Sequence, residues 1–542
     1  MKVNQLRAGT LLSYVNLAIG SIIPMIYTPI MLRMLGQAEY GLYSLSNSIV
    51  GYLSLLNFGF GSTIIRYICK YRAEGKKEQV RSVFGLFLVI YGIVSALVII
   101  GGFVLVLCTD ACFSKGLTPQ EVDKLKILII MMAFNTAIAF PISVFSSIIT
   151  AYERFVFRRV VDIFSTVLAP VVNIVLLYFG FGSIGMTFSG LLLNFIACPI
   201  NIYYCFKVLK ITPKFVRFES AFIKELLVFS VYIFIGTLVD MLFWATDKVI
   251  LGALVGTVVV AIYNVGSTFN NILMQLSQAV SGVIGPKINS MVTLDGDNTE
   301  ALSEVFIRIG RLQYLLLALV VSGFIAFGHP FLIMWAGESY GESYYIALLT
   351  MIPLVIPYIQ NTGLTIVIAQ NKHKFRSLVY LAIAILNAVS TYFIVPYLGG
   401  IGAALCSCVS YVLGQGIIMN IYYYKVTKIN IPLFWKNILC MSWIPTLLCV
   451  ITFVVSNFIS FYFWSAFLFA VLIYALLYSI GSWFFSMNDY EKDAIRVPIR
   501  NLMNKLKKRK AWLKNENSCG RNRVCWLVYR YFAVSAQRSY CC

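Results

Sequence analysis

Apolar stretches of about 20 residues recur along nearly the whole chain, and this pattern constrains the fold more than any other feature of the sequence. An α-helix rises about 1.5 Å per residue, so each stretch can cross a hydrocarbon core about 30 Å thick. Apolar residues make up 60% of the chain and charged residues only 12%. A water-soluble fold has too little polar surface at this composition. We therefore predict an all-α polytopic membrane protein.

Fourteen apolar segments are predicted to be transmembrane helices. The first ends at Arg33 without a small-residue cleavage site, so we expect a retained helix and not a removed signal peptide. The predicted spans are residues 11–32, 41–65, 83–107, 127–150, 160–179, 184–206, 226–253, 258–285, 312–334, 345–369, 378–397, 401–424, 437–459 and 462–486.

The net charge of +21 is explained by membrane topology. With the N-terminus inside, 38 of the 43 Lys and Arg residues fall in or beside the inner loops and the C-terminal tail. Basic loops resist translocation and are attracted to the anionic inner leaflet, so this distribution predicts that both termini are cytoplasmic. Nucleic acid is accordingly excluded as a partner.

The 13 cysteines predict neither a disulfide framework nor a zinc site. Only Cys108 and Cys112 fall near an outer loop, where oxidation could pair them. Cys519 and Cys525 lack a second Cys or His pair at zinc-site spacing, since the chain has only two His residues. We expect inert thiols and no metal centre.

The two halves of the chain contain matching segments at a nearly constant offset, which predicts an internal repeat. Six predicted helices per repeat is an even number, so both copies enter the membrane from the same side and are related by an axis along the membrane normal. We expect an N-terminal six-helix lobe at 1–224, a second at 225–424, two added helices at 437–486 and a basic cytoplasmic tail at 487–542. The matched positions are Tyr43 with Tyr263, Pro141 with Pro357, Phe157-Arg158 with Phe375-Arg376, and Ile184-Gly185 with Ile401-Gly402.

Three segments carry a resemblance to a known family: Met34 to Tyr43 (MLGQAEYGLY), Asn57 to Arg66 (NFGFGSTIIR) and Asp247 to Gly252 (DKVILG). They resemble the polysaccharide-transporter branch, the Wzx-type flippases, of the multidrug/oligosaccharidyl-lipid/polysaccharide exporter superfamily. The resemblance covers about residues 6–486. It implies a bilobed, MATE-like transporter of the bacterial cytoplasmic membrane.

The same resemblance implies the cargo: undecaprenyl-diphosphate-linked oligosaccharide, a repeat unit of O-antigen, capsule or another surface polysaccharide, moved to the outer leaflet by alternating access. It implies no cofactor beyond a coupling H⁺ or Na⁺, and polysaccharide assembly proteins as further partners. The alternative within the superfamily is a cation-coupled multidrug exporter. A membrane polysaccharide polymerase is disfavoured because the longest outer loop, about 108–126, leaves no room for a catalytic domain. The chain is predicted not to be an enzyme.

Charged residues within predicted spans are the first candidates for the transport site, since a central charge costs about 2.5 to 3.5 kcal/mol on insertion scales. The span 226–253 contains Asp240, Asp247 and Lys248. Asp240 and Asp247 are seven residues apart and are expected to share a helix face and one cavity with Lys248. They are predicted to be proton or sodium sites, and Lys248 a diphosphate contact. A buried structural ion pair is the alternative.

Polar residues on two other spans complete the predicted site. Asn264, Ser267, Asn271, Gln275 and Gln278 follow one helical face. Of these, Asn271, Gln275 and Gln278 are predicted to contact sugar hydroxyls, with interhelical hydrogen bonding as the alternative.

Arg66 and Lys70, one turn apart at the inner end of the second span, are predicted to meet the diphosphate. The alternative is that this pair only fixes the topology. Arg158, Arg159 and Arg376 are interpreted as topological, because they belong to basic inner loops.

The tail contains a predicted basic amphipathic helix. Ile499, Leu502, Met503 and Leu506 recur at helical spacing, with five Lys and Arg between residues 505 and 510. Such a helix lies on the inner leaflet, so we expect an anchor.

Overall fold

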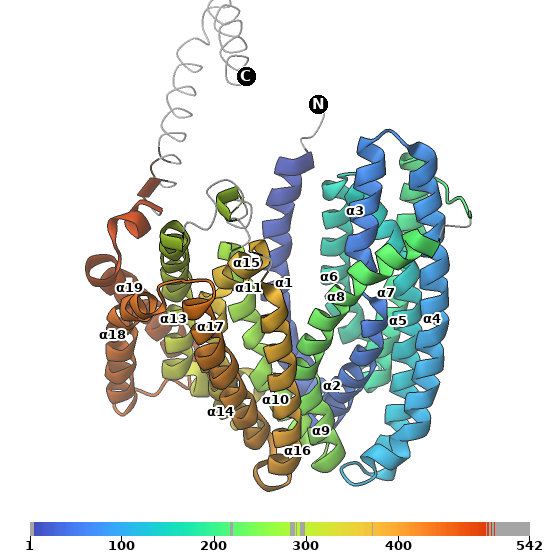
Figure 1. The fold of residues 1–542 in the computed structure, drawn as a ribbon. Coiled ribbons are helices and arrows are strands. Elements are labelled where there is room, and N and C mark those ends of the chain that lie inside the picture. The colour runs from blue at the N-terminus through green and yellow to red at the C-terminus, as the bar shows by residue number, and fades with distance from the viewer. Residues whose placement is uncertain are drawn as a thin grey trace, which may run out of the picture.

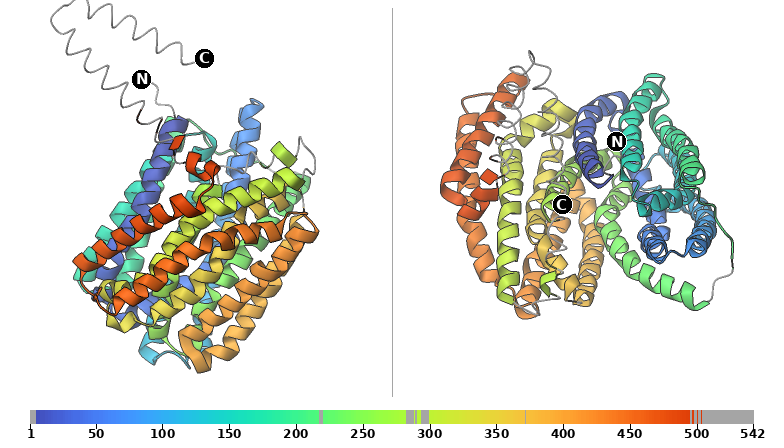
Figure 2. Two further views of the ribbon diagram at one scale, coloured as in Figure 1. Left: turned by 90° about the vertical axis from the view of Figure 1, so that its left-hand side faces the viewer. Right: turned by 90° about the horizontal axis from the view of Figure 1, so that it is seen from above.

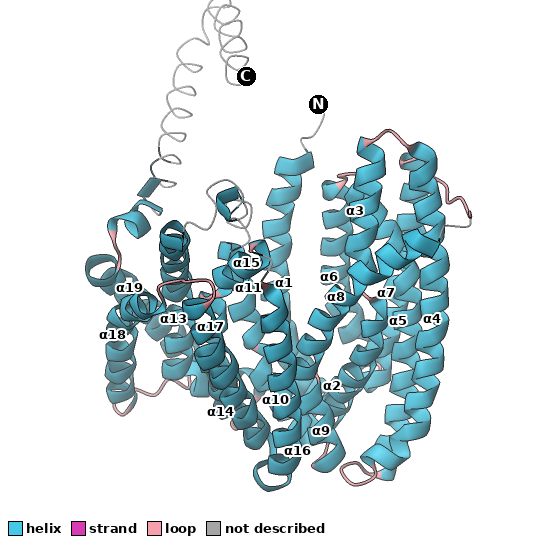
Figure 3. Ribbon diagram, in the orientation of Figure 1, coloured by secondary structure: helices cyan, strands magenta, loops and turns pink. Residues whose placement is uncertain are grey.

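The computed structural model describes residues 5–494 apart from 217–219, 282–287, 289, 293–298 and 371, and in addition residues 496, 497, 500 and 503. Helices and their connections account for all of this part of the chain, without a strand (Figure 3). The predicted amphipathic tail helix lies almost wholly outside the described residues. Cys519 and Cys525 lie entirely outside them.

The first half of the chain forms a bundle of long helices. Thr118 begins one of them with a capping box, in which its hydroxyl accepts from the backbone N–H of Glu121 and the Glu121 carboxylate accepts from the backbone N–H of Thr118. The elements are α1 (Gln5–Leu35), α2 (Gln37–Gly51), η1 (Tyr52–Asn57), α3 (Phe60–Ala73), α4 (Lys77–Phe113), α5 (Pro119–Ala151), α6 (Phe155–Tyr178), α7 (Gly182–Tyr203) and η2 (Tyr204–Val208).

The second half forms another group of helices beside the first, and α1 lies between the two groups when the molecule is seen from above (Figure 2). Its elements are α8 (Ser220–Trp244), α9 (Thr246–Leu254), α10 (Thr257–Thr268), α11 (Asn270–Ser281), α13 (Thr299–Ala336), η3 (Glu338–Tyr340), α14 (Ser343–Ile359), α15 (Asn361–Ala369), α16 (His373–Tyr411), η4 (Val412–Ile418) and α17 (Met419–Lys425).

Two further helices and a final turn, α18 (Ile431–Ser456), α19 (Trp464–Gly481) and η5 (Ser482–Ser486), pack on the outside of the second half (Figure 1). A buried ion pair ties them to it: Arg311 of α13 donates to both carboxylate oxygens of Glu491, at 2.6 and 3.0 Å. Arg311 also donates to Asn437 of α18 at 3.0 Å and to the carbonyl of Ser486 at 2.9 Å. Hydrogen bonds to all three nitrogens satisfy the guanidinium, which burial would otherwise penalise.

Twelve helical segments of the described chain are long and apolar enough to cross a membrane. The predicted all-α membrane fold is confirmed, whereas the count of fourteen spans stays a prediction. Two places account for the difference. The predicted spans 378–397 and 401–424 fall in one continuous helical segment, Lys374–Lys425, in which the backbone leaves the helical region only at Gly399. The predicted span 226–253 has no counterpart among the twelve segments, although α8 (Ser220–Trp244) by itself has 25 residues; the helix is interrupted at Ala245, before α9.

The two halves pack tightly at the end of the molecule where α9 meets α10, at the bottom of Figure 1. Glycine makes this approach feasible: a Cβ added to Gly41 of α2 would lie 1.8 Å from the carbonyl oxygen of Thr257. Hydrogen bonds cross the same contact, from Asn264 to the hydroxyl of Tyr40 at 2.6 Å and from Thr257 to Glu121 at 2.7 Å. The end of the molecule opposite to the start of α1 is therefore closed by direct contact between the halves.

The predicted domain boundaries at 224/225 and 424/437 remain predictions. One apolar core cluster includes residues of α2, α5, α10 and α13, so it is shared by both halves, whereas the second cluster is built almost entirely from α3, α4 and α5. The two halves therefore pack against each other through a shared apolar core at one end of the molecule. Each half also has contacts among its own helices.

Candidate functional site

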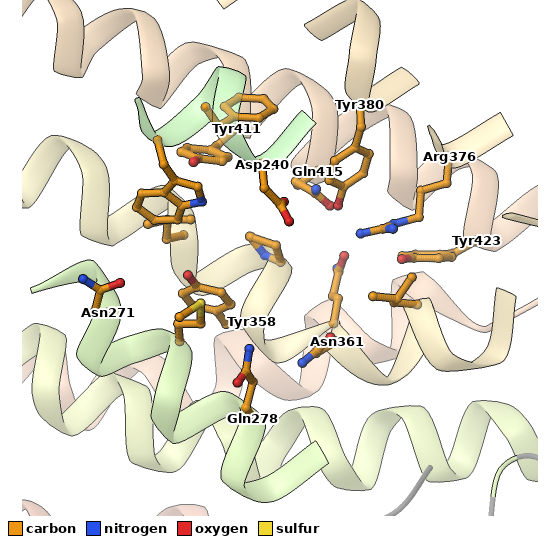
Figure 4. Close-up of a pocket in the computed structure, with 17 residues that line it drawn as sticks. Asp240, Asn271, Gln278, Tyr358, Asn361, Arg376, Tyr380, Tyr411, Gln415 and Tyr423 are labelled. Atoms are coloured by element: carbon orange, nitrogen blue, oxygen red, sulfur yellow. The ribbon is translucent and has the colours of Figure 1, made fainter. Parts of the chain in front are cut away.

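A polar cavity of about 480 Å³ lies within the second half, inside the membrane-spanning region (Figure 4). Five parts of the chain converge on it: α8, α11, the α14–α15 junction, α16 and the η4–α17 segment. Its volume falls in the range of small-molecule sites. Its lining residues are Asp240, Phe243, Trp244, Asn271, Met274, Gln278, Leu354, Pro357, Tyr358, Gln360, Asn361, Leu364, Arg376, Tyr380, Tyr411, Gln415 and Tyr423.

Arg376 supplies the cavity with a positive charge. Its guanidinium lies 4.1 Å from the centre of the Tyr380 ring, a cation–π contact that orients it. The Nε atom is buried and has no hydrogen-bond partner in the protein. An unmatched buried donor on a charged group costs free energy, and an anionic ligand that accepts from it would remove this cost. Asp240 faces the same cavity (Figure 4).

Amide and aromatic side chains form the rest of the wall. Asn271, Gln278, Gln360, Asn361 and Gln415 offer both donors and acceptors. The Oε1 atom of Gln360 is buried without a partner, while its Nε2 donates to Asn420 at 2.8 Å. Four tyrosines and Trp244 add flat apolar rings with a polar edge. Amides beside flat rings match a sugar, which presents hydroxyls at its rim and C–H groups on its faces.

Three of the eight predicted site residues line this cavity: Asp240, Asn271 and Gln278. Gln275 points elsewhere and accepts a hydrogen bond from Ser21 of α1 at 3.2 Å. Arg66 and Lys70 are exposed on α3, in the other half of the molecule. The structure does not bring these last two into the cavity.

Asp247 is fully buried, and its carboxylate accepts hydrogen bonds from neutral side chains of other helices. The donors are Tyr263 at 2.6 Å, Ser407 at 2.8 Å, Thr391 at 3.3 Å and Asn387 at 3.4 Å. Within the described residues there is no group of three or more His, Cys, Asp or Glu arranged to hold a metal ion. Asp247 is surrounded by three hydroxyl groups and the amide nitrogen of Asn387, all of which donate to its carboxylate.

Lys248 faces a different cavity, of about 490 Å³, which is lined mainly by α1 and α2, with single residues or pairs from α6 to α10. Its ammonium donates to Asn264 at 2.6 Å, and Asn264 in turn donates to Tyr40 at 2.6 Å. The expectation that Asp240, Asp247 and Lys248 share one cavity is wrong. The helix is interrupted at Ala245, so the seven-residue periodicity does not continue from Asp240 to Asp247.

A second interruption divides the predicted polar face of residues 264–278. Helix α10 ends at Thr268 and α11 begins at Asn270. Asn264 lines the Lys248 cavity, whereas Asn271 and Gln278 line the Arg376 cavity. The structure places Arg376, which the sequence assigns to a basic inner loop, in the wall of the cavity. The match of Phe157-Arg158 with Phe375-Arg376 was the signal that marked this position.

The family follows from a comparison with known protein families. The model described as "Polysaccharide biosynthesis protein" matches residues 6–292, more than half of the 542-residue chain. The chain belongs to the polysaccharide biosynthesis protein family. The resemblance inferred from the three sequence segments is confirmed, since all three lie within the matched region.

Individual relatives of this family member are distant in sequence. It is 23% identical over 435 residues to the "Uncharacterized membrane protein EpsK" of Bacillus subtilis, covering 76% of this chain and 82% of the relative. It is 21% identical over 401 residues to a "Putative O-antigen transporter" of Shigella flexneri, covering 72% and 91%.

Solved structures share the fold of the chain. "Lipid II flippase MurJ, inward closed conformation" aligns with a TM-score of 0.68 at 15% identity, over 88% of this chain and 97% of that one. An inward-facing MATE family multidrug transporter aligns with a TM-score of 0.57 at 16% identity, over 78% and 99%. The fold is thus the one adopted by MurJ and the MATE transporters.

Proposed function

We propose that this protein is a flippase that moves a lipid-linked oligosaccharide from the inner to the outer leaflet of a bacterial cytoplasmic membrane. The observation that supports this proposal is the Arg376 cavity, where a half-buried guanidinium lies beside amides and aromatic rings. The diphosphate and sugars of such a lipid cannot cross about 30 Å of hydrocarbon unaided. The cavity provides what both need: a guanidinium for the diphosphate and an amide-and-tyrosine wall for the sugar.

Alternating access follows from the closed contact between the halves. Separation of α2 from α10 would expose the Lys248 cavity, which lies directly behind that contact. Trp244 lines both the Arg376 cavity and the Lys248 cavity, at the point where α8 ends. We infer that the head group passes from the first cavity toward the second, and that the interruption at Ala245 lets α8 and α9 move separately. With both termini cytoplasmic, the closed end faces the outside.

A monovalent cation at Asp247 would couple the cycle to an ion gradient. The carboxylate is fully buried among neutral donors, and a buried charge needs a cation or a proton to offset its desolvation. Its donors come from α10 and α16. Binding at this position would therefore hold α9, α10 and α16 together, and release would let them rearrange.

The coupling proposal predicts a specific effect of Asp247→Asn, which keeps the shape but removes the charge. In proteoliposomes with an imposed proton or sodium gradient, the dependence of transport on the gradient should disappear. Asp110→Asn is the matched control, because Asp110 is exposed and paired with Lys126 at 2.7 Å. An Asp247→Asn protein that still responds to the gradient as the wild type does would contradict coupling at this site.

The function itself is tested by deleting the gene and locating lipid-linked sugars. Loss of a flippase traps the intermediate in the inner leaflet, where an impermeant sugar-modifying reagent added outside cannot reach it. Loss of a polymerase leaves the intermediate exported but unpolymerised. Increased drug sensitivity with normal export of the intermediate would instead favour a multidrug exporter.

A further inference from the structure

The first half of the molecule contains a polar cavity of its own, of about 370 Å³, between α3, α5, α6 and α7. Small hydroxyl and amide side chains make up half of its lining residues, which is unusual inside a membrane-spanning bundle. Its polar lining residues are Ser143, Ser146, Ser147, Thr150, Arg158, Asp162, Ser165, Asn194 and Asn201.

This N-half cavity is the repeat counterpart of the Arg376 cavity. Arg158 is the fourth residue of α6 and Arg376 the fourth residue of α16, and the two are 218 positions apart in the internal repeat. Pro141 and Pro357 are also matched in the repeat: Pro141 lies in α5, directly before α6, and Pro357 lies in α14, with the short α15 between it and α16. Each half thus carries a polar cavity with an arginine at the same structural position.

The two copies differ in how the arginine is paired, since each cavity is lined by one arginine and one aspartate. Arg158 forms an ion pair with Asp162 at 3.2 Å and donates to Ser146 at 2.5 Å. Asp162 also pairs with Arg159 at 3.4 Å, but Arg159 does not line the cavity. Arg376 has an unmatched Nε, as described above. The N-half cavity is therefore suited to an uncharged ligand and the Arg376 cavity to an anion.

The N-half cavity also has an unmatched acceptor. Asn201 is only 2% exposed, and its Nδ2 donates to the carbonyl of Ala197 at 2.9 Å. Its Oδ1 has no partner. Ser143 and Thr150 direct their protons to helix carbonyls, which leaves their oxygen lone pairs as acceptors. The wall therefore favours a neutral ligand that donates several hydrogen bonds.

We propose that the N-half cavity is a second substrate site, which binds uncharged sugar units of the transported lipid while the Arg376 cavity binds its diphosphate. Sugar hydroxyls donate to Asn201 and to the serine and threonine oxygens. This inference rests on the proposed flippase function. It assigns the two copies of the repeat to the two polar parts of one substrate.

The test measures binding to the full-length protein in nanodiscs with three probes. They are the lipid-linked oligosaccharide extracted from the host membrane, undecaprenyl diphosphate without sugar, and the free oligosaccharide released from the lipid. Asn201→Leu and Ser147→Ala remove acceptors from the N-half cavity. Thr109→Val is the control, because Thr109 is equally buried on α4 and donates only to its own helix at 2.8 Å.

Each N-half variant should weaken binding of the lipid-linked oligosaccharide about five- to tenfold, as expected for one lost hydrogen bond, and leave undecaprenyl diphosphate binding unchanged. Competition by the free oligosaccharide in the wild type, lost in Asn201→Leu, would further support a sugar site. Equal binding of the lipid-linked oligosaccharide by Asn201→Leu, Ser147→Ala and Thr109→Val would overturn the inference. If the wild type binds neither lipid, the flippase proposal itself fails.

Discussion

Replacing Arg376 with Gln is expected to reduce transport of the lipid-linked oligosaccharide about 100-fold, with only a small loss of stability. The Nε atom has no hydrogen-bond partner in the protein, so the substitution breaks no hydrogen bond at that atom. It does remove the cation–π contact with Tyr380 and the positive charge that faces Asp240 in the same cavity. A charge-assisted hydrogen bond to the diphosphate contributes about 1.5 to 3 kcal/mol, which corresponds to a factor of about 10 to 150. Transport is measured in proteoliposomes, and stability by thermal unfolding in detergent.

Two further variants test whether the loss of transport is specific to the guanidinium of Arg376. Arg376→Lys keeps the charge but not the forked geometry, so an intermediate loss is expected. Arg308→Gln removes an exposed arginine that pairs with Glu304 on the surface of α13, and it should transport normally. If Arg376→Gln transports as well as Arg308→Gln, the cavity is not the diphosphate site.

Replacing Gly41 with Ala is expected to prevent the halves from closing at the α2–α10 contact. The added Cβ would lie 1.8 Å from the carbonyl oxygen of Thr257, which is backbone and cannot rotate away. Helices α2 and α10 must then separate, so the population shifts toward a state open at this end. Ser44 on α2 is 5% exposed and lines the Lys248 cavity. In a Ser44→Cys background, labelling by an impermeant maleimide added outside should accelerate at least about tenfold.

A graded series of glycine variants controls this experiment. Gly92→Ala on α4 adds a Cβ with nothing within 4 Å, so its labelling should match the wild type. Gly252→Ala meets the flexible end of the Leu45 side chain at 2.6 Å, which can move, and should have a smaller effect. Unchanged labelling in a Gly41→Ala protein that inserts and unfolds normally would contradict the role of this contact in closure.

The sequence predicted the residues that face the Arg376 cavity only in part. Asp240, Asn271 and Gln278 were found because charged and amide residues are costly in a membrane and therefore conspicuous. Asp247, Lys248 and Gln275 are equally costly inside a membrane, but in the structure none of them lines the Arg376 cavity. The breaks at Ala245 and Phe269 separate α8 from α9 and α10 from α11, and charged and amide residues before and after each break line different cavities.

The sequence by itself determined the membrane class, the approximate positions of most spanning helices, the repeat and the family. These follow from local properties: run length against bilayer thickness, and recurring residues at a fixed offset. Only the tertiary structure decided which polar groups meet. Arg376 enters a cavity, its repeat partner Arg158 is paired with Asp162, and Gly41 touches Thr257. These contacts depend on where helices are interrupted and how helices distant in the sequence approach one another. The hydropathy of either segment alone does not indicate such contacts.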